Sequence, residues 1–242
     1  MNVHNLGKIF LKKANIGYCV ICEKKTVFVE ENSWKREFYK CIRCHSIPRM
    51  RAIINALNIF FPAWPDLVIH ESSPDGASAD LIRDKCKNYS ASHFFQDVKA
   101  GNSKLGCRCE NLESMTFADS SFDLFITQDV FEHIMNPEAA FKEIARVLKP
   151  GGTHIFTMPW YSKLEKSVRR AKLEDGKIVH LLEPVYHGNP IDAAGSLVTY
   201  DWGRDFTDII YSICGMTTVI YLAYNRKLGL DAEFLEVFSS RK

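Results

Sequence analysis

The chain has 242 residues, of which 46% are hydrophobic and 25% charged, and its formal net charge is +2. This is ordinary globular composition, and the length limits the fold to one or two domains. No apolar run approaches the about 20 residues that cross a bilayer, and the first 13 residues lack the apolar core of a signal peptide, so we expect a cytoplasmic protein without membrane contact.

The charge is distributed unevenly along the chain. Residues 1–60 hold 11 Lys and Arg against 4 Glu, whereas the remainder holds 20 against 25 acidic residues. A basic N-terminal segment can face an anionic partner such as nucleic acid, although small modules are often basic without one. Both interpretations stay open at this point.

Four of the eight cysteines share one repeated spacing, Cys19-x2-Cys22-x18-Cys41-x2-Cys44. Each CxxC turn can direct two thiolates at one ion, and the intervening KKTVFVEENSWKREFYK alternates as a β-hairpin with its turn at residues 31–33. Four thiolates fill the positions of a tetrahedral zinc ion. The spacing therefore predicts a structural zinc in a small module over residues 1–45, with a redox pair or free thiols as the alternatives.

The next segment, SIPRMRAIINALNIFFP, repeats its apolar residues at helical spacing. Ser46 can cap this helix and Pro48 falls in its first turn. It predicts a helix over residues 46–61 that connects the cysteine module to the main domain. A solvated helix face is favoured for Arg49 and Arg51, with contact to an acidic ligand as the alternative.

Residues 62–242 alternate strands with helices. The strand candidates are DLVIHE, YSASHFF, FDLFITQ and THIFTMP, and the helix candidates are GASADLIRDKCK and PEAAFKEIARVLK, the second capped by Asn136. This order predicts an α/β fold with a doubly wound, mostly parallel sheet, whose ligands bind at the carboxyl ends of the strands. A helical stripe from Phe206 ends at Gly215, and TTVIYLAY and EFLEVFSS predict an antiparallel pair that completes the sheet.

Three motifs follow one another in the middle of the chain: ENLESMTF, SFDLFITQDVFEHI and ARVLKPGG. In this order the sequence resembles the class I S-adenosylmethionine-dependent methyltransferases, in particular their type 11 branch, well over residues 66–160 and more loosely beyond. The cysteine module followed by CxxCxSxPRxRA, with the later HGNP and SLVTYDWGRD, resembles a bacterial subgroup that joins a zinc ribbon to this domain. The resemblance implies a Rossmann-like methyltransferase domain over residues 62–242 that uses S-adenosylmethionine.

The resemblance also implies which residues bind the cofactor. Glu71 ends the first strand, where the family holds the cofactor's amino group directly or through water. In the following turn, where the family has several glycines, this chain has the small residues Ser73 and Gly76. Ser92 lies nearest the position of the family's ribose carboxylate, with Asp97 five residues further along. S-adenosylmethionine carries no phosphate, so the missing GxGxxG argues more against a dinucleotide than against this cofactor.

Further along, Asn111 and Leu112 match the pair that contacts the adenine ring, with Glu110 as a competing position. Gln128 and Asp129 follow the strand at which the family presents the methyl donor. These residues complete the cofactor site that the resemblance implies.

Methyl transfer is an in-line displacement at a sulfonium, for which an enzyme supplies alignment and, for a hydroxyl or protonated amine, a base. Asp129, His133 and His187 are the candidate catalytic residues, although His133 can equally serve packing and His187 can be a loop histidine without a role. Gly188, Asn189 and Pro190 predict a turn that presents His187, and the acceptor pocket can be lined by aromatic residues, which are Tyr161, Tyr186 and Trp202.

Neither a GxSxG elbow nor a P-loop is present, so serine hydrolase and nucleotide triphosphatase chemistry lack support. We expect a methyltransferase acting on an oxygen or nitrogen nucleophile of a small molecule or sugar. One alternative is an RNA methyltransferase that docks through the basic module. The other is a binding protein in which the methyltransferase fold has lost its activity.

Overall fold

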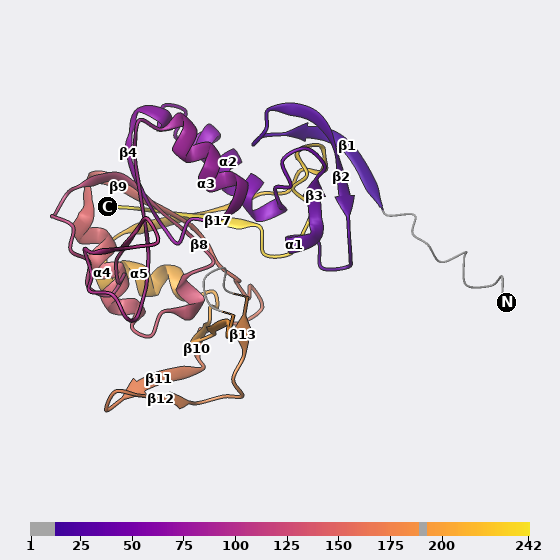
Figure 1. Cartoon of the computed structure of the whole chain (residues 1–242). Helices are drawn as coiled ribbons and strands as arrows, with labels where there is room; N and C mark the ends of the chain where they lie inside the picture. The colour runs from indigo at the N-terminus through magenta and orange to yellow at the C-terminus, as the bar shows by residue number, and fades with distance from the viewer. Residues whose placement is uncertain (1–12, 189–192) are drawn as a thin grey trace.

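A computed structural model describes residues 13–188 and 193–242, and its centre is an eight-stranded sheet (Figure 1). The strand order is β16-β17-β9-β8-β4-β5-β7-β6. Five strands run parallel: β4 (Val68–Ser72), β5 (Asn88–His93), β7 (Cys107–Cys109), β8 (Phe122–Gln128) and β9 (Leu148–Thr157). Antiparallel pairings add β6 (Ser103–Lys104), β16 (Thr217–Leu222) and β17 (Glu236–Arg241). The predicted α/β fold with a mostly parallel sheet, completed by an antiparallel pair, is confirmed.

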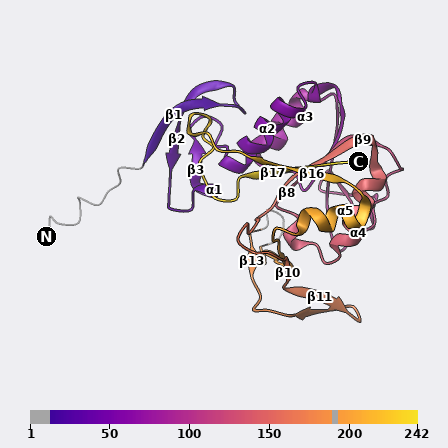
Figure 2. The ribbon, with the colours of Figure 1, turned by 180° about the vertical axis from the view of Figure 1, so that it is seen from behind.

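Helices cover both faces of the sheet, as Figures 1 and 2 show. On one face lie α2 (Pro48–Phe60) and α3 (Gly76–Lys85), and on the other α4 (Pro137–Val147) and α5 (Phe206–Cys214). Side chains of the strands pack into two cores, one on each face of the sheet. Leu124 and Ile126 belong to the core under α2 and α3, whereas Phe125 between them belongs to the core under α4 and α5. This alternation follows from the period of two in a strand, and it is why β8, buried on both faces, is apolar at most of its positions.

The helix boundaries follow the local sequence. Asn136 caps α4 through its side-chain oxygen, which accepts from the Ala139 N–H at 3.2 Å, and Pro137 takes the first helical position. Gly215 ends α5 in the left-handed conformation, at φ 73°. Both predictions are confirmed. The prediction that Ser46 caps α2 is wrong, because Ile47 occupies that position without a side-chain bond.

The N-terminal module is a three-stranded antiparallel sheet of β1 (Ala14–Cys19), β2 (Lys24–Glu30) and β3 (Tyr39–Cys41). Strands β2 and β3 pair as the predicted hairpin does. The segment that connects β2 to β3 is longer than the predicted turn, because it contains the short helix α1 (Lys35–Phe38).

Arg51 lies at the junction of this module with the main domain. It is fully buried, so its predicted place on a solvated face is wrong. Its guanidinium donates to the carbonyl oxygens of Tyr39 and Gly229, each at 2.8 Å, and to that of Ser46. It also lies over the Phe28 ring, 4.6 Å from the centroid. Carbonyl groups from three separate segments therefore satisfy one buried cation.

An insertion between β9 and α5 extends away from the sheet (Figure 1). Its strands are short: β10 (Val168–Arg169), β11 (Ala171–Glu174), β12 (Lys177–His180), β13 (Tyr186–His187), β14 (Ser196–Leu197) and β15 (Tyr200–Asp201). Within residues 13–188 and 193–242 the structure also has the 3₁₀ turns η2 (Trp64–Asp66), η3 (Phe131–His133) and η4 (Arg226–Leu228). Among the described residues, no helix combines the length and apolar character needed to cross a membrane.

Candidate active site at the carboxyl ends of the strands

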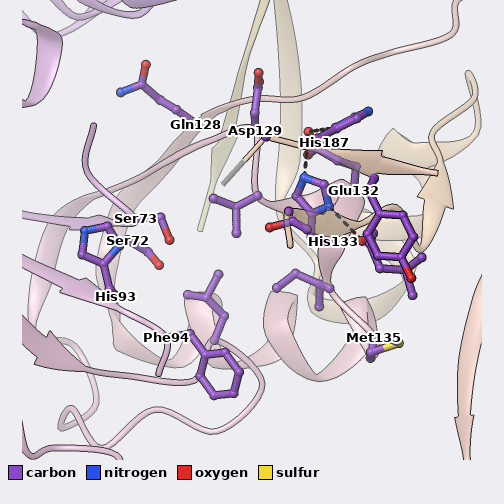
Figure 3. A pocket seen from close by; sticks show the side chains of 18 of the residues that line it. Ser72, Ser73, His93, Phe94, Gln128, Asp129, Glu132, His133, Met135 and His187 are labelled. Atoms are coloured by element: carbon purple, nitrogen blue, oxygen red, sulfur yellow. Dashed lines mark hydrogen bonds and ion pairs between the residues drawn. The ribbon is translucent and has the colours of Figure 1, made fainter. Parts of the chain in front are cut away.

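A cavity of about 1230 Å³ opens at the carboxyl ends of the parallel strands. The segments after β4, β5, β7, β8 and β9 line it, together with α1 of the N-terminal module and strands of the insertion. In Figure 3, Ser72, Ser73 and His93 lie on one side and Glu132, His133 and His187 on the other. The chain passes from β4 to β5 on one side and later to β8 on the other, so the cavity lies at the switch point where open α/β sheets bind ligands.

The turn between β4 and α3 contains two residues in the left-handed conformation, Ser73 at φ 58° and Gly76 at φ 63°. The Ser73 N–H donates to the Ser92 carbonyl oxygen at 2.7 Å, which fixes the turn against β5. A Cβ at position 76 would collide with the Met50 side chain of α2. The single glycine of this turn thus suits a positive φ at the point where α2 approaches, while Ser72, Ser73 and Asp75 line the cavity.

Glu71 lies fully buried beneath this turn. Its two carboxylate oxygens accept hydrogen bonds from the Tyr89 hydroxyl at 2.8 Å and from Gln128 Nε2 at 2.9 Å. Burial raises the pKa of Glu71 to about 7, although both hydrogen bonds oppose that shift. Glu71 is not among the residues that line the cavity, whereas Gln128 is. The carboxylate therefore holds Gln128 in place at the cavity wall.

Ser92 points away from the cavity. Its hydroxyl lies 2.9 Å from His70 Nε2, on the opposite face of the sheet, and it is 1% exposed. The next residue, His93, lines the cavity, and burial lowers its pKa. Because side chains alternate along a strand, a difference of one position exchanges the two faces. Sequence reasoning missed His93 for this reason. Asp97, also at the cavity, is exposed and pairs with Lys104 at 2.6 Å.

Asn111 and Leu112 line the cavity after β7. The Asn111 side-chain oxygen accepts from the Glu113 N–H at 2.9 Å, which forms a local turn, and Leu112 is 4% exposed. Glu110, the competing position, accepts from Arg108 at 2.6 Å and from the Thr116 N–H at 2.9 Å. These bonds commit the Glu110 carboxylate to the loop, and the Asn111–Leu112 pair faces the open space beside it.

Asp129 follows β8 in the left-handed conformation, at φ 53°. Its carboxylate oxygens lie 2.6 and 2.7 Å from one Arg36 nitrogen and 3.6 Å from Arg49 Nε, and one accepts from the Thr157 hydroxyl at 2.9 Å. Burial would raise the pKa of Asp129, but the two guanidiniums outweigh it and hold the pKa at about 2. A carboxylate held in this state is a poor proton acceptor at neutral pH, and it anchors the N-terminal module to the cavity.

Three ionisable residues meet at the other end of the cavity: Glu132 and His133 in η3 and His187 in β13. Glu132 Oε1 lies 3.7 Å from His133 Nε2 and 3.7 Å from His187 Nδ1 (Figure 3). The nearby Glu132 carboxylate raises the pKa of His187. Sequence reasoning selected both histidines and missed Glu132. The predicted turn that presents His187 falls partly outside the described residues, at Asn189 and Pro190.

The predicted aromatic lining divides between the cavity and the core. Tyr161 and Tyr186 line the cavity, and they are 38% and 56% exposed. Trp202 is 1% exposed and packs among the core residues beneath α4 and α5. Two of the three aromatic residues are thus available to contact a ligand.

The four cysteines of the N-terminal module converge. Their sulfur atoms all lie within 4.8 Å of one another, with Cys19 and Cys44 3.6 Å apart and Cys22 and Cys41 3.9 Å apart. Four thiolates bonded to one zinc at about 2.3 Å would be separated by about 3.8 Å. The geometry and the donor set are compatible with such an ion.

Known proteins resemble this chain in sequence and in fold. Residues 79–156 match the family described as a methyltransferase domain. A ubiquinone biosynthesis O-methyltransferase of Parvibaculum lavamentivorans is 37% identical over 57 residues, which is 23% of this chain and only 22% of that protein. An S-adenosylmethionine-bound amino pentose methyltransferase of Micromonospora echinaspora superposes with a TM-score of 0.50 over 80% of this chain and 91% of its own, at 12% identity.

A methyltransferase of Mesorhizobium loti, described as dependent on S-adenosylmethionine, covers 79% of this chain and 98% of its own, with a TM-score of 0.49 and 16% identity. Residues 79–156 match a methyltransferase domain by sequence, and the sheet has the Rossmann-like fold of the amino pentose methyltransferase.

Proposed function

We propose that this protein transfers a methyl group from S-adenosylmethionine to an oxygen or nitrogen nucleophile of a small molecule. The observation that carries the proposal is the single cavity that joins the β4, β5, β7 and β8 loops to the cluster of Glu132, His133 and His187. The matched residues 79–156 include those that line it at the ends of β5 and β8 and after β7. The cavity is large enough for a cofactor and an acceptor together.

In this proposal the cofactor lies against the β4–α3 turn. Ser73 and Gly76 allow close approach, Gln128 contacts the amino acid part of the cofactor, and Glu71 acts behind Gln128 as its positioning residue. Asn111 and Leu112 receive the adenine ring. We assign to His93 the contact with the ribose hydroxyls that the sequence predicts for Ser92. The Ser92 hydroxyl is bonded to His70, whereas His93 lines the cavity.

The acceptor then lies toward His133 and His187, which activate its nucleophilic atom. Asp129 supports the site by holding Arg36 and Arg49 rather than by exchanging protons, given its low pKa. In the reaction, the nucleophile's electron pair forms a bond to the methyl carbon as the carbon–sulfur bond breaks. The electron pair of that bond stays on sulfur, and S-adenosylhomocysteine is the product.

A small acceptor is favoured over RNA by where the basic residues lie. Arg36 and Arg51 are 3% and 0% exposed, and Arg49 faces Asp129 and Glu37. Part of the positive charge of residues 1–60 is therefore neutralised inside the protein, and less remains for a phosphate backbone.

We also propose a structural zinc ion on Cys19, Cys22, Cys41 and Cys44, within a module of residues 1–45 joined by residues 46–61 to a methyltransferase domain of residues 62–242. The compatible sulfur geometry supports it. A C44S variant should lose one equivalent of zinc by elemental analysis after chelator-free purification. If the wild-type chain contains less than half an equivalent, the zinc proposal fails.

Calorimetric titration with S-adenosylmethionine and S-adenosylhomocysteine tests the enzymatic proposal. His93→Ala should weaken binding of both about tenfold, because one or two hydrogen bonds are lost. His180→Ala is the matched control, since this histidine lines the same cavity beyond the proposed cofactor site. No heat at millimolar cofactor would leave a binding protein without methyltransferase activity as the remaining alternative.

The acceptor side is tested by formation of S-adenosylhomocysteine with a panel of small hydroxylated and aminated compounds. His187→Ala should lower turnover and leave cofactor affinity unchanged, because His187 lies at the far end of the cavity from the β4–α3 turn (Figure 3). Turnover equal to that of the wild type would refute the assignment of His187.

A further inference from the structure

Glu132 is a buried carboxylate without a hydrogen-bond partner. It is 2% exposed, and neither of its oxygens accepts a hydrogen bond within the described structure. Leaving such a group unpaired costs several kcal/mol, so buried carboxylates are expected to be paired with a cation or to coordinate a metal. Glu132 lines the cavity, which allows that cation to come from solution.

His133 presents a ring nitrogen to Glu132 rather than a donated proton. His133 Nδ1 lies 2.9 Å from the Leu197 carbonyl oxygen, which can only accept, so Nδ1 carries the proton. In the neutral ring, Nε2 then holds a lone pair, and it is this atom that faces Glu132 Oε1 at 3.7 Å. Two lone-pair atoms directed at each other repel unless a cation lies between them.

The spacing of the three groups fits a shared ion better than a hydrogen-bonded chain. Both separations from Glu132 Oε1 are 3.7 Å, beyond the about 3.2 Å limit of a good hydrogen bond, and the three candidate ligand atoms all lie within 4.8 Å of one another. Ligands bonded at about 2.1 Å to a tetrahedral ion would be about 3.4 Å apart. The two separations from Glu132 would therefore need to contract by only about 0.3 Å.

We propose that Glu132, His133 and His187 bind a divalent first-row transition metal ion. Two imidazoles and one carboxylate suit zinc, iron, manganese or cobalt, and three protein ligands leave further positions open to the cavity. The Leu197 carbonyl oxygen fixes the His133 tautomer as outer groups commonly do for metal-bound histidines. Since His187 comes from β13, the ion also fastens the insertion to η3.

Resting on the proposed methyltransferase function, this site specifies its acceptor as one with a hydroxyl group. The metal binds the hydroxyl oxygen and lowers its pKa, and the proton leaves to water. The resulting oxygen anion forms a bond to the methyl carbon, and the carbon–sulfur bond breaks as described above. His133 and His187 then act as ligands and take no proton from the acceptor.

Titration of the metal-free full-length chain with Co²⁺ tests the site without cofactor or acceptor. The cysteine site should bind with thiolate-to-cobalt charge-transfer absorption in the near ultraviolet. A second equivalent of Co²⁺, bound at Glu132, His133 and His187, should add weaker bands in the visible range and no further thiolate charge-transfer absorption. Its affinity should fall at least about 100-fold in Glu132→Gln and His187→Ala, because loss of an outer partner alone costs up to that factor. The control His180→Ala should bind both equivalents as the wild type does.

The thiolate band reports that each variant is folded. The proposal is overturned if the wild-type chain binds cobalt only with thiolate absorption, or if His187→Ala binds the second equivalent with unchanged affinity. A variant series in which turnover falls while metal stoichiometry stays constant would instead identify Glu132 and His187 as a proton-transfer pair. Failure to bind S-adenosylmethionine would refute the proposed function and leave the metal result standing, so the two failures are distinguishable.

Discussion

Replacing Glu71 by Gln should stabilise the protein at alkaline pH. Burial raises the pKa of this carboxyl from 4.5 to about 7, so folding favours its protonated form. The wild-type protein therefore loses stability as pH rises from 4.5 through 7. The difference of about 2.5 pKa units corresponds to about 3 kcal/mol, of which about 2.5 kcal/mol falls between pH 5 and pH 8.

The hydrogen-bond network can survive this substitution. A glutamine oxygen can accept from Gln128 Nε2 as Glu71 Oε1 does, and its NH₂ group can donate to the Tyr89 hydroxyl oxygen, which reverses that bond. The variant therefore removes the titrating charge and keeps both partners. It should also weaken cofactor binding if the ionised carboxylate holds Gln128 for the ligand.

Equilibrium urea unfolding of both proteins at pH 5 and pH 8 measures the effect. The free energy of unfolding of Glu71→Gln, minus that of the wild type, should rise by about 2.5 kcal/mol between the two pH values. Glu138→Gln is the control, because Glu138 pairs with Lys142 on the surface of α4 and its pKa is lowered, so its small pH effect has the opposite sign. A Glu71→Gln difference that does not change with pH would refute the reasoning.

Three further substitutions test the packing around the cavity. Gly76→Ala should cost about 1 kcal/mol more than Gly106→Ala in thermal unfolding, since both residues have positive φ but only at position 76 must the flexible end of Met50 move aside; equal losses would contradict the collision. Arg36→Met should cost roughly 3–5 kcal/mol in urea unfolding by leaving Asp129 short of its main partner, and a loss under 1 kcal/mol would mean that Arg49 suffices. Ile144→Ala should cost about 2–5 kcal/mol through a core cavity, and a smaller loss would indicate that the α4 face collapses to fill it.

The elements of the main domain were predictable because their patterns are local. Pro137 and Asn136 start α4, Gly215 ends α5, and the apolar run of β8 is long enough to identify a buried strand. These signals depend on residues within a few positions of one another, which is where propensity and periodicity act.

The contacts that shape the cavity were not predictable in the same way. Arg36 reaches Asp129 across 93 positions of sequence, and no local pattern distinguishes it from the other basic residues of its segment. The choice between Ser92 and His93 depends on the register at the end of β5. Glu132 becomes notable only when the fold buries it without a partner. Each of these features depends on how distant segments of the chain pack together, which local sequence patterns do not determine.

The position of β17 has a consequence for synthesis on the ribosome. This strand lies between β16 and β9, although it follows both in the chain. Arg51 and Arg36 likewise find carbonyl acceptors at Gly229 and Phe234. While residues 229–241 are still being made, β9 keeps an unpaired edge and both arginines stay solvated. The nascent chain should therefore depend on chaperones until its last strand inserts, and a gene divided after residue 61 should not yield two separately folding products.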